Sequence, residues 1–213
     1  MIDTIKAVLE NTQNRTPMVH SITNNVTIND CANIILAAGG TAIMAQDERE
    51  VEEITSHAQA LVINMGAVRA QEAMLRAAKI AKRTGRPVVL DPVAAGASTL
   101  RREMCSRLLS ENLVSVIRGN ASEVRALAAG AEQETGVEAS ALDSVTEAAI
   151  QASLEKLSRG RTTIVVAHRL ATVRGADHIA VIDKEGVSEY GTHQELMEKN
   201  GLYAALWNTQ KLS

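Results

Sequence analysis

The chain has 213 residues, 46% of them hydrophobic and 22% charged, which excludes a largely disordered protein. Its formal net charge of −3 argues against a broad nucleic-acid-binding face, so we expect no nucleic-acid partner. No apolar run reaches the ~20 residues that cross a bilayer, and no signal peptide is recognisable, so we expect a cytoplasmic protein with no membrane partner. Cys31 and Cys105 are expected to be buried, reduced thiols, and no residues have the spacing of a metal site.

Strands and helices are predicted to alternate from residue 17 onward. After a polar loop at 21–25, the pattern predicts helices over 26–38, 51–58, 70–84, 100–109 and 121–128, with strands at 41–44, 60–64, 87–91 and 115–118 between them. Further on it predicts a helix over 143–158, a strand at 162–167, a hairpin of 179–182 with 186–190, and a helix opened by the capping box Thr192-x-x-Glu195. The predicted fold is α/β: three layers, a mostly parallel sheet with helices on both faces, plus a small C-terminal hairpin and helix.

Polar residues stand at the carboxyl ends of three apolar strands. They are Asn64, Asp91 and the run Arg118-Gly119-Asn120. Ligands of open parallel sheets bind at that edge, and an arginine with a carboxylate and an amide suits a phosphate and its magnesium. The alternative is that these side chains only cap helices and tie loops.

Several long motifs resemble the hydroxyethylthiazole kinase family over residues 5–138. The motifs are Pro17-Met-Val-His-Ser-Ile-Thr-Asn-Asn-Val26, Val62-Ile-Asn-Met-Gly66, Leu90-Asp-Pro-Val-Ala-Ala-Gly-Ala97 and Ile117-Arg-Gly-Asn-Ala-Ser-Glu123. The resemblance implies a ribokinase-like fold and a trimeric enzyme that phosphorylates a thiazole alcohol with ATP and magnesium.

The resemblance also implies roles for single residues. By position, Asn24, Met44 and Gly66 would line the thiazole pocket, which lies at a subunit interface in the family. Arg118 and Asn120 would bind the nucleotide, and Asp91 and Glu123 would hold or orient magnesium. The residue types fit these roles, since an arginine fork matches phosphate oxygens and carboxylates suit a hard cation.

The motifs of that family stop near residue 138. The family continues with a Gly-Thr-Gly-Cys turn that supplies backbone N–H groups to the transferring phosphate, whereas this sequence contains no Gly-x-Gly.

Residues 139–210 instead resemble the C-terminal part of an ABC-exporter nucleotide-binding domain. Ser140-Ala-Leu-Asp143 is similar to its D-loop, and His168 to the histidine that senses the terminal phosphate. The phosphate-binding loop and the Leu-Ser-Gly-Gly-Gln signature of that family do not occur. His168 could equally be an ordinary strand-end histidine, and Glu138 is one residue out of register for the catalytic glutamate.

The interpretation drawn from these patterns is an engineered chimera of fragments 1–138 and 139–213, joined near 136–141 and folded as one continuous domain. The uneven composition agrees with two sources, because every aromatic residue follows residue 189 and every proline precedes residue 93. With both sets of phosphate-binding elements incomplete, the chimera is expected to have no catalytic residue, no catalytic activity and no required cofactor. The alternatives are weak binding of Mg-ATP or the thiazole alcohol, or residual phosphotransferase activity; the oligomeric state is left open.

Overall fold

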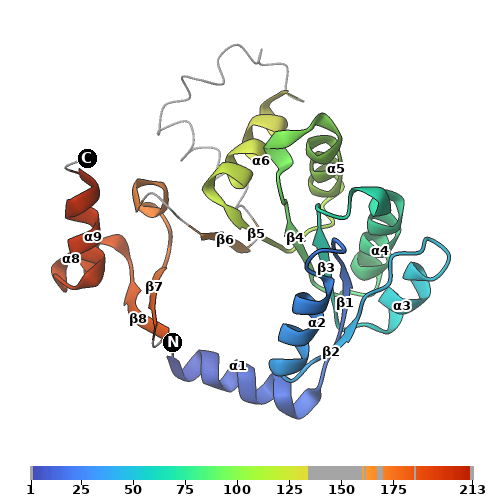
Figure 1. Cartoon of the computed structure of the whole chain (residues 1–213), viewed down its shortest axis with the longest axis horizontal. Helices are drawn as coiled ribbons and strands as arrows, with labels where there is room; N and C mark the ends of the chain where they lie inside the picture. The colour runs from blue at the N-terminus through green and yellow to red at the C-terminus, as the bar shows by residue number, and fades with distance from the viewer. Residues whose placement is uncertain (1, 134–159, 161, 167–169, 185, 212–213) are drawn as a thin grey trace.

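The structure is a computed structural model that describes residues 2–133, 160, 162–166, 170–184 and 186–211. Six parallel strands form the main sheet in the order β2-β1-β3-β4-β5-β6 (Figure 1). Their bounds are β1 Met18–Ile22, β2 Thr41–Ile43, β3 Ala60–Asn64, β4 Val88–Asp91, β5 Val116–Asn120 and β6 Thr162–Val166. A separate antiparallel pair consists of β7 Ile179–Asp183 and β8 Gly186–Gly191.

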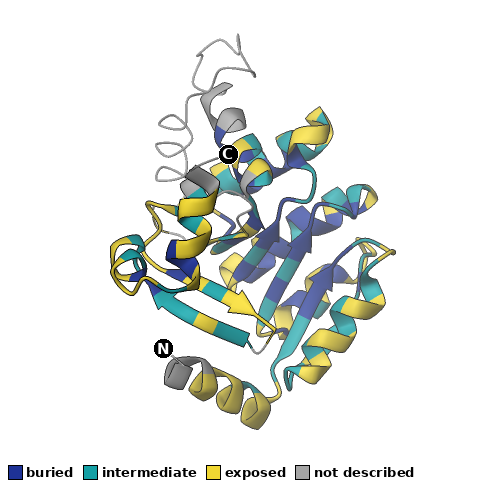
Figure 2. Cartoon of the chain, turned by 60° about the vertical axis from the view of Figure 1, so that its left-hand side comes forward, coloured by how far each residue is buried: buried dark blue, intermediate teal, exposed yellow. Residues whose placement is uncertain are grey.

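One helix precedes the parallel strands, and the other helices of the sheet alternate with them. They are α1 Ile2–Arg15, α2 Ile28–Ala37, α3 Val51–His57, α4 Gln71–Arg83, α5 Thr99–Ser110 and α6 Ala121–Gln133, with short 3-10 turns at Val68–Ala70 (η1), Ala95–Ala97 (η2) and Leu170–Val173 (η3). Helix α4 packs against α3 and α5, and α5 against α6, so these four helices form one continuous layer. Helix α1 projects away from the sheet and is largely exposed where its side chains are described (Figure 2).

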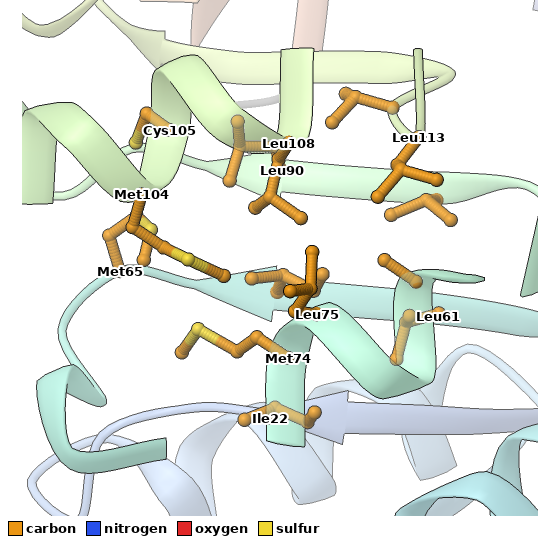
Figure 3. Packing of buried hydrophobic residues seen from close by; sticks show 14 of the residues in the cluster. Ile22, Leu61, Met65, Met74, Leu75, Leu90, Met104, Cys105, Leu108 and Leu113 are labelled. Carbon is orange, nitrogen blue, oxygen red and sulfur yellow. The ribbon is translucent and has the colours of Figure 1, made fainter. Parts of the chain in front are cut away.

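The main hydrophobic core lies between the sheet and the layer of α3 to α6. Because side chains alternate along a strand and the strands pair in register, Leu61, Ile63, Leu90 and Ile117 all point to one face, where each is fully buried. Figure 3 shows Leu61 and Leu90 packed among helix residues such as Met74 and Leu108. The residues between them, such as Val62 and Val89, are only half-buried. At the end of the sheet, Ile164 and Val166 of β6 are 51% and 53% exposed.

The C-terminal hairpin has a small hydrophobic cluster of its own. Strand β8 of the hairpin packs against α8, His193–Glu198, and this helix is followed by α9, Leu202–Lys211. Ile179, Leu196 and Tyr203 are buried there, with Trp207 packed against them. The predicted capping box is present: Thr192 accepts a hydrogen bond from the N–H of Glu195, whose carboxylate accepts one from the N–H of Thr192 at 2.8 Å. The Glu189 carboxylate caps α9 in turn, by accepting from the N–H groups of Leu202 and Tyr203.

These observations confirm the predicted fold class, a mostly parallel sheet surrounded by helices with a small hairpin after it. Helix α2 begins later than predicted because Asn24 Oδ1 accepts from the N–H groups of Val26 and Thr27 and forms a turn there. Strand β6 pairs in parallel with β5 over five residues, so residues 162–166 belong to the same sheet as the N-terminal strands. The helix predicted over 143–158 lies outside the described residues.

Two further sequence predictions concern single features. Both cysteines are free; Cys105 is buried, and its burial raises the pKa of the thiol to about 12, but Cys31 is only half-buried. In the part of the chain that the structure describes, no helix combines the length and the apolar character needed to cross a membrane.

Candidate functional site

The carboxyl ends of β1, β3, β4 and β5 bring most of the predicted site residues to one edge of the sheet. The parallel register places Asn64 at the end of β3 directly beside Asp91 at the end of β4. Arg118 lies on β5, the next strand. Adjacent parallel strands thus deliver an amide, a carboxylate and a guanidinium to the edge at which open α/β sheets bind ligands.

Asp91 is the central acidic group of this edge. It is 8% exposed, and its Oδ2 accepts hydrogen bonds from Arg118 Nη1 at 2.7 Å and from Asn64 Nδ2 at 3.1 Å. Burial raises the pKa of Asp91 above its ordinary value, and the positive charge of Arg118 opposes that rise. The Arg118 side chain is 58% exposed, so its guanidinium holds the carboxylate and still faces solvent, where a phosphate group could reach it.

Asn24, Asn64 and Gly66 form the neighbouring part of the site. Asn64 Oδ1 accepts from the N–H of Gly66 at 2.8 Å and from Asn24 Nδ2 at 3.4 Å. A Cβ atom added to Gly66 would lie 2.6 Å from Asn64 Oδ1 and 2.9 Å from Asn24 Nδ2. Only glycine therefore permits this close approach, which places two of the three predicted thiazole residues against the strand end that also contacts Asp91.

Glu123 and Asn120 form a capping box at the start of α6. Asn120 Oδ1 accepts from the N–H of Glu123 at 2.9 Å, and Glu123 Oε2 accepts from the N–H of Asn120 at 2.9 Å. Glu123 Oε1 also accepts from the N–H of Ala94 at 3.3 Å. Both carboxylate oxygens are therefore engaged with backbone N–H groups, and in this geometry the two side chains cap a helix and fix the 92–97 loop.

Met44 lies one residue beyond β2, and a buried histidine fixes the backbone next to it. His20 Nε2 donates to the carbonyl oxygen of Ala45 at 3.0 Å, and its Nδ1 lies 2.8 Å from the hydroxyl of Thr55 on α3. His20 is fully buried, and this burial lowers its pKa. The sequence motif contained His20 but did not reveal this role, because its two partners are 25 and 35 residues away.

The structure thus brings Asn24, Gly66, Asp91 and Arg118 together through Asn64, which the strand pattern had placed at this edge without a specific role. His168 and Glu138 lie outside the described residues. Among the described residues there is no cluster of three metal-ligating side chains. Asp91 alone would suit Mg²⁺, which keeps several waters and commonly takes one or two carboxylates together with phosphate oxygens from its substrate.

The fold is that of an α/β protein with a parallel sheet, and its paired carboxylate and arginine lie at the edge where such sheets commonly bind ligands. The sequence model of the hydroxyethylthiazole kinase family matches residues 9–188. The hydroxyethylthiazole kinase of Clostridium acetobutylicum is 49% identical over 145 residues, and that of Desulfovibrio desulfuricans is 47% identical over 164 residues. The structure of hydroxyethylthiazole kinase protein from Pyrococcus horikoshii has a TM-score of 0.63 and 35% identity, covering 78% of this chain and 61% of that one.

This chain therefore belongs to the hydroxyethylthiazole kinase family. The match to the Clostridium protein covers 67% of this chain and 53% of that relative, and the match to the Desulfovibrio protein covers 75% of this chain and 58% of that relative. The chain therefore spans about half the length of these two relatives.

The interpretation as an inactive engineered chimera is wrong. The family match extends to residue 188 and so crosses the junction that was expected at 136–141. The relatives that carry 47–49% identity are named as kinases, which favours the phosphotransferase alternative over a protein without catalytic activity. These findings give no support to an ABC-ATPase origin for residues 139–210.

Proposed function

We propose that this protein binds a hydroxyethylthiazole and Mg-ATP at the carboxyl edge of its sheet and transfers the terminal phosphoryl group to the alcohol. The observation that carries the proposal is the continuous hydrogen-bonded series Asn24–Asn64–Asp91–Arg118, in which residues assigned to the alcohol and to the nucleotide meet at one strand end. Family membership supplies the substrate class, and because the chain spans about half of its relatives, the complete reaction is part of the proposal. We place it in the cytoplasm.

Each residue has a physical role in this proposal. Asn24 and Gly66 line the alcohol side, for which Met44 is a further candidate, and Arg118 directs its exposed guanidinium to phosphate oxygens. Asp91 would hold Mg²⁺, because both of its described hydrogen bonds are made by Oδ2. Bound Mg²⁺ would neutralise charge on the phosphates. Glu123 would orient the site through the 92–97 loop and not as a direct ligand, since both its oxygens accept backbone N–H groups. Asn120 would act through the same cap, and His168 is a further candidate for contact with the nucleotide.

The test has a binding arm and a turnover arm. Calorimetry with 4-methyl-5-(2-hydroxyethyl)thiazole and, separately, with Mg-ATP should detect both ligands, and a coupled assay should detect ADP release that depends on the alcohol. Arg118→Gln should weaken Mg-ATP binding by about tenfold, the effect of losing a charge-assisted hydrogen bond, and should affect alcohol binding less. Binding of both ligands with no phosphorylated product would overturn the kinase activity, and binding of neither would overturn the site itself.

A further inference from the structure

The strand pattern predicted Asn64 at the ligand edge of the sheet, but neither the motifs nor the family comparison gave it a specific role. It is 9% exposed at the end of β3, and its side-chain amide lies between the two groups of residues described above. On one side, its Oδ1 accepts from the N–H of Gly66 at 2.8 Å and from Asn24 at 3.4 Å. On the other side, its Nδ2 donates to Asp91 at 3.1 Å.

The orientation of this amide is fixed by the chemistry of its partners. The N–H of Gly66 can only donate, and the ionised carboxylate of Asp91 can only accept. A rotated Asn64 amide would place donor against donor at Gly66 and acceptor against acceptor at Asp91. A single rotamer therefore satisfies both sides, and it does so in a buried position where an unmade hydrogen bond is costly.

Arg118 extends the same connection toward the phosphate side. Its Nη1 donates to Asp91 Oδ2, the same oxygen that accepts from Asn64 Nδ2. A displacement of Asp91 toward a bound cation would therefore act on the Asn64 amide, and through Oδ1 on Gly66 and Asn24. Glycine at position 66 permits this contact, because an added Cβ would lie 2.6 Å from Asn64 Oδ1.

We propose that Asn64 is a positioning residue that couples the alcohol side of the site, Asn24 and Gly66, to the phosphate side, Asp91 and Arg118. The names of the two sides rest on the proposed function, whereas the coupling between the residues is a property of the ligand-free chain. Asn64 thus makes the position of the alcohol-binding loop depend on the state of Asp91.

The first arm of the test needs no ligand and measures amide hydrogen exchange at Gly66 by NMR. Asn64→Ala removes the acceptor, so exchange at Gly66 should become about fivefold faster, the effect of one lost neutral hydrogen bond. The N–H of Met65 is the internal reference, because it donates to the backbone oxygen of Asp91 at 2.9 Å and should be unaffected. Leu108→Ala, a core change remote from the site, controls for general destabilisation and should accelerate Met65 and Gly66 together.

A double-mutant cycle tests the coupling itself. Asp91→Ala should accelerate exchange at Gly66 about twofold to fivefold in the presence of Asn64, since the amide loses the partner that fixes it, and should have no further effect in the Asn64→Ala background. The affinity for 4-methyl-5-(2-hydroxyethyl)thiazole alone should follow the same non-additive pattern.

The outcomes separate this inference from the proposed function. Unchanged exchange at Gly66 in Asn64→Ala, or effects of the two substitutions that simply add, would overturn the role of Asn64. Failure of the unmodified chain to bind the thiazole alcohol would overturn the proposed function, while the exchange cycle would still decide whether Asn64 couples the two sides.

Discussion

Asp91 and Arg118 form an ion pair whose members differ in exposure, with side chains that are 11% and 58% exposed. Removing Arg118 leaves a buried carboxylate without its cation, whereas Asp91→Asn removes the buried charge and keeps an acceptor oxygen for its neighbours. We expect Arg118→Gln to lower the free energy of unfolding by about 1 kcal/mol and Asp91→Asn to leave it unchanged or raise it. Urea denaturation at pH 7 measures both, and a loss of several kcal/mol in Asp91→Asn would show that the carboxylate is a structural group.

His20 gives the fold a dependence on pH. The buried ring has a lowered pKa, so the folded chain resists the proton that the unfolded chain takes up as the pH falls through about 6.5. Burial is the main cause of the lowered His20 pKa, whereas the hydrogen bond to the Ala45 carbonyl and the charge of Glu50 raise that pKa by a smaller amount. Stability should therefore decrease from pH 7.5 to 5.5, by at most about 1.4 kcal/mol per pH unit for one proton.

Paired urea titrations at pH 7.5 and 5.5 check this expectation. His20→Gln should be less stable at pH 7.5 but should lose this component of the pH dependence. His57→Gln is the matched control, because His57 is exposed at the end of α3, and it should retain the pH dependence of the unmodified chain. An equal pH dependence in His20→Gln and the unmodified chain would contradict the assignment.

At the scale of single residues, the sequence indicated which side chains reach the site but not which of them form hydrogen bonds with one another. Asn64, Asp91 and Arg118 could be predicted because each ends an apolar strand and parallel strands share a carboxyl edge. The contact of Gly66 with Asn64 and Asn24 could not, because it depends on the path of two loops. The Asn120-x-x-Glu123 spacing is that of a capping box and could have revealed the helix cap before any role toward magnesium was assigned.

At the scale of elements, the two faces of β6 differ in exposure. Val165 packs against the main hydrophobic cluster, whereas its neighbour Ile164 is 51% exposed. Val165→Asp would place a charge against that cluster and should destabilise the sheet by about 2–3 kcal/mol. Ile164→Asp is the matched control on the other face and should cost less than about 1 kcal/mol. Thermal unfolding followed by circular dichroism compares them, and equal losses would show that the two faces are buried alike.

The apolar runs predicted the strands well because a strand buried against helices has few polar positions. Their ends were less certain: β5 continues through Arg118 to Asn120, two residues beyond the predicted end, since pairing with β6 extends that far. Nothing in the spacing of single elements could give the strand order, in which β1 lies between β2 and β3.

At the scale of the whole molecule, the two hydrophobic clusters consist of different residues on different elements. Leu196→Ala should therefore destabilise the hairpin and its helices by about 2–5 kcal/mol and leave the main sheet unaffected. Leu90→Ala is the reciprocal control, since both leucines are fully buried. Amide exchange should accelerate in β7 and β8 for the first variant and in β3 and β4 for the second. Acceleration of all four strands by Leu196→Ala would show that the clusters unfold as one unit.

The error of the chimera interpretation also belongs to this scale. The uneven placement of the aromatic residues follows from packing and does not require two sources. The aromatic residues lie after residue 189 because the small C-terminal cluster uses them: Tyr203 is fully buried, and Trp207 lies with its ring centre 4.5 Å from that of His193. The main core, by contrast, contains no aromatic residue and is filled chiefly by leucine, isoleucine, valine, methionine and alanine on the sheet and helices.

The restriction of all aromatic residues to the C-terminal part of the chain determines how the protein absorbs ultraviolet light. With one tryptophan, two tyrosines and no phenylalanine, all of them after residue 189, the chain absorbs ultraviolet light near 280 nm only through its C-terminal hairpin and helices. Because no tryptophan or tyrosine lies in the six-stranded sheet, intrinsic fluorescence does not directly report on the sheet or on the site at its edge. A fragment clipped before residue 190 would keep the whole sheet and yet disappear from any absorbance trace recorded at that wavelength.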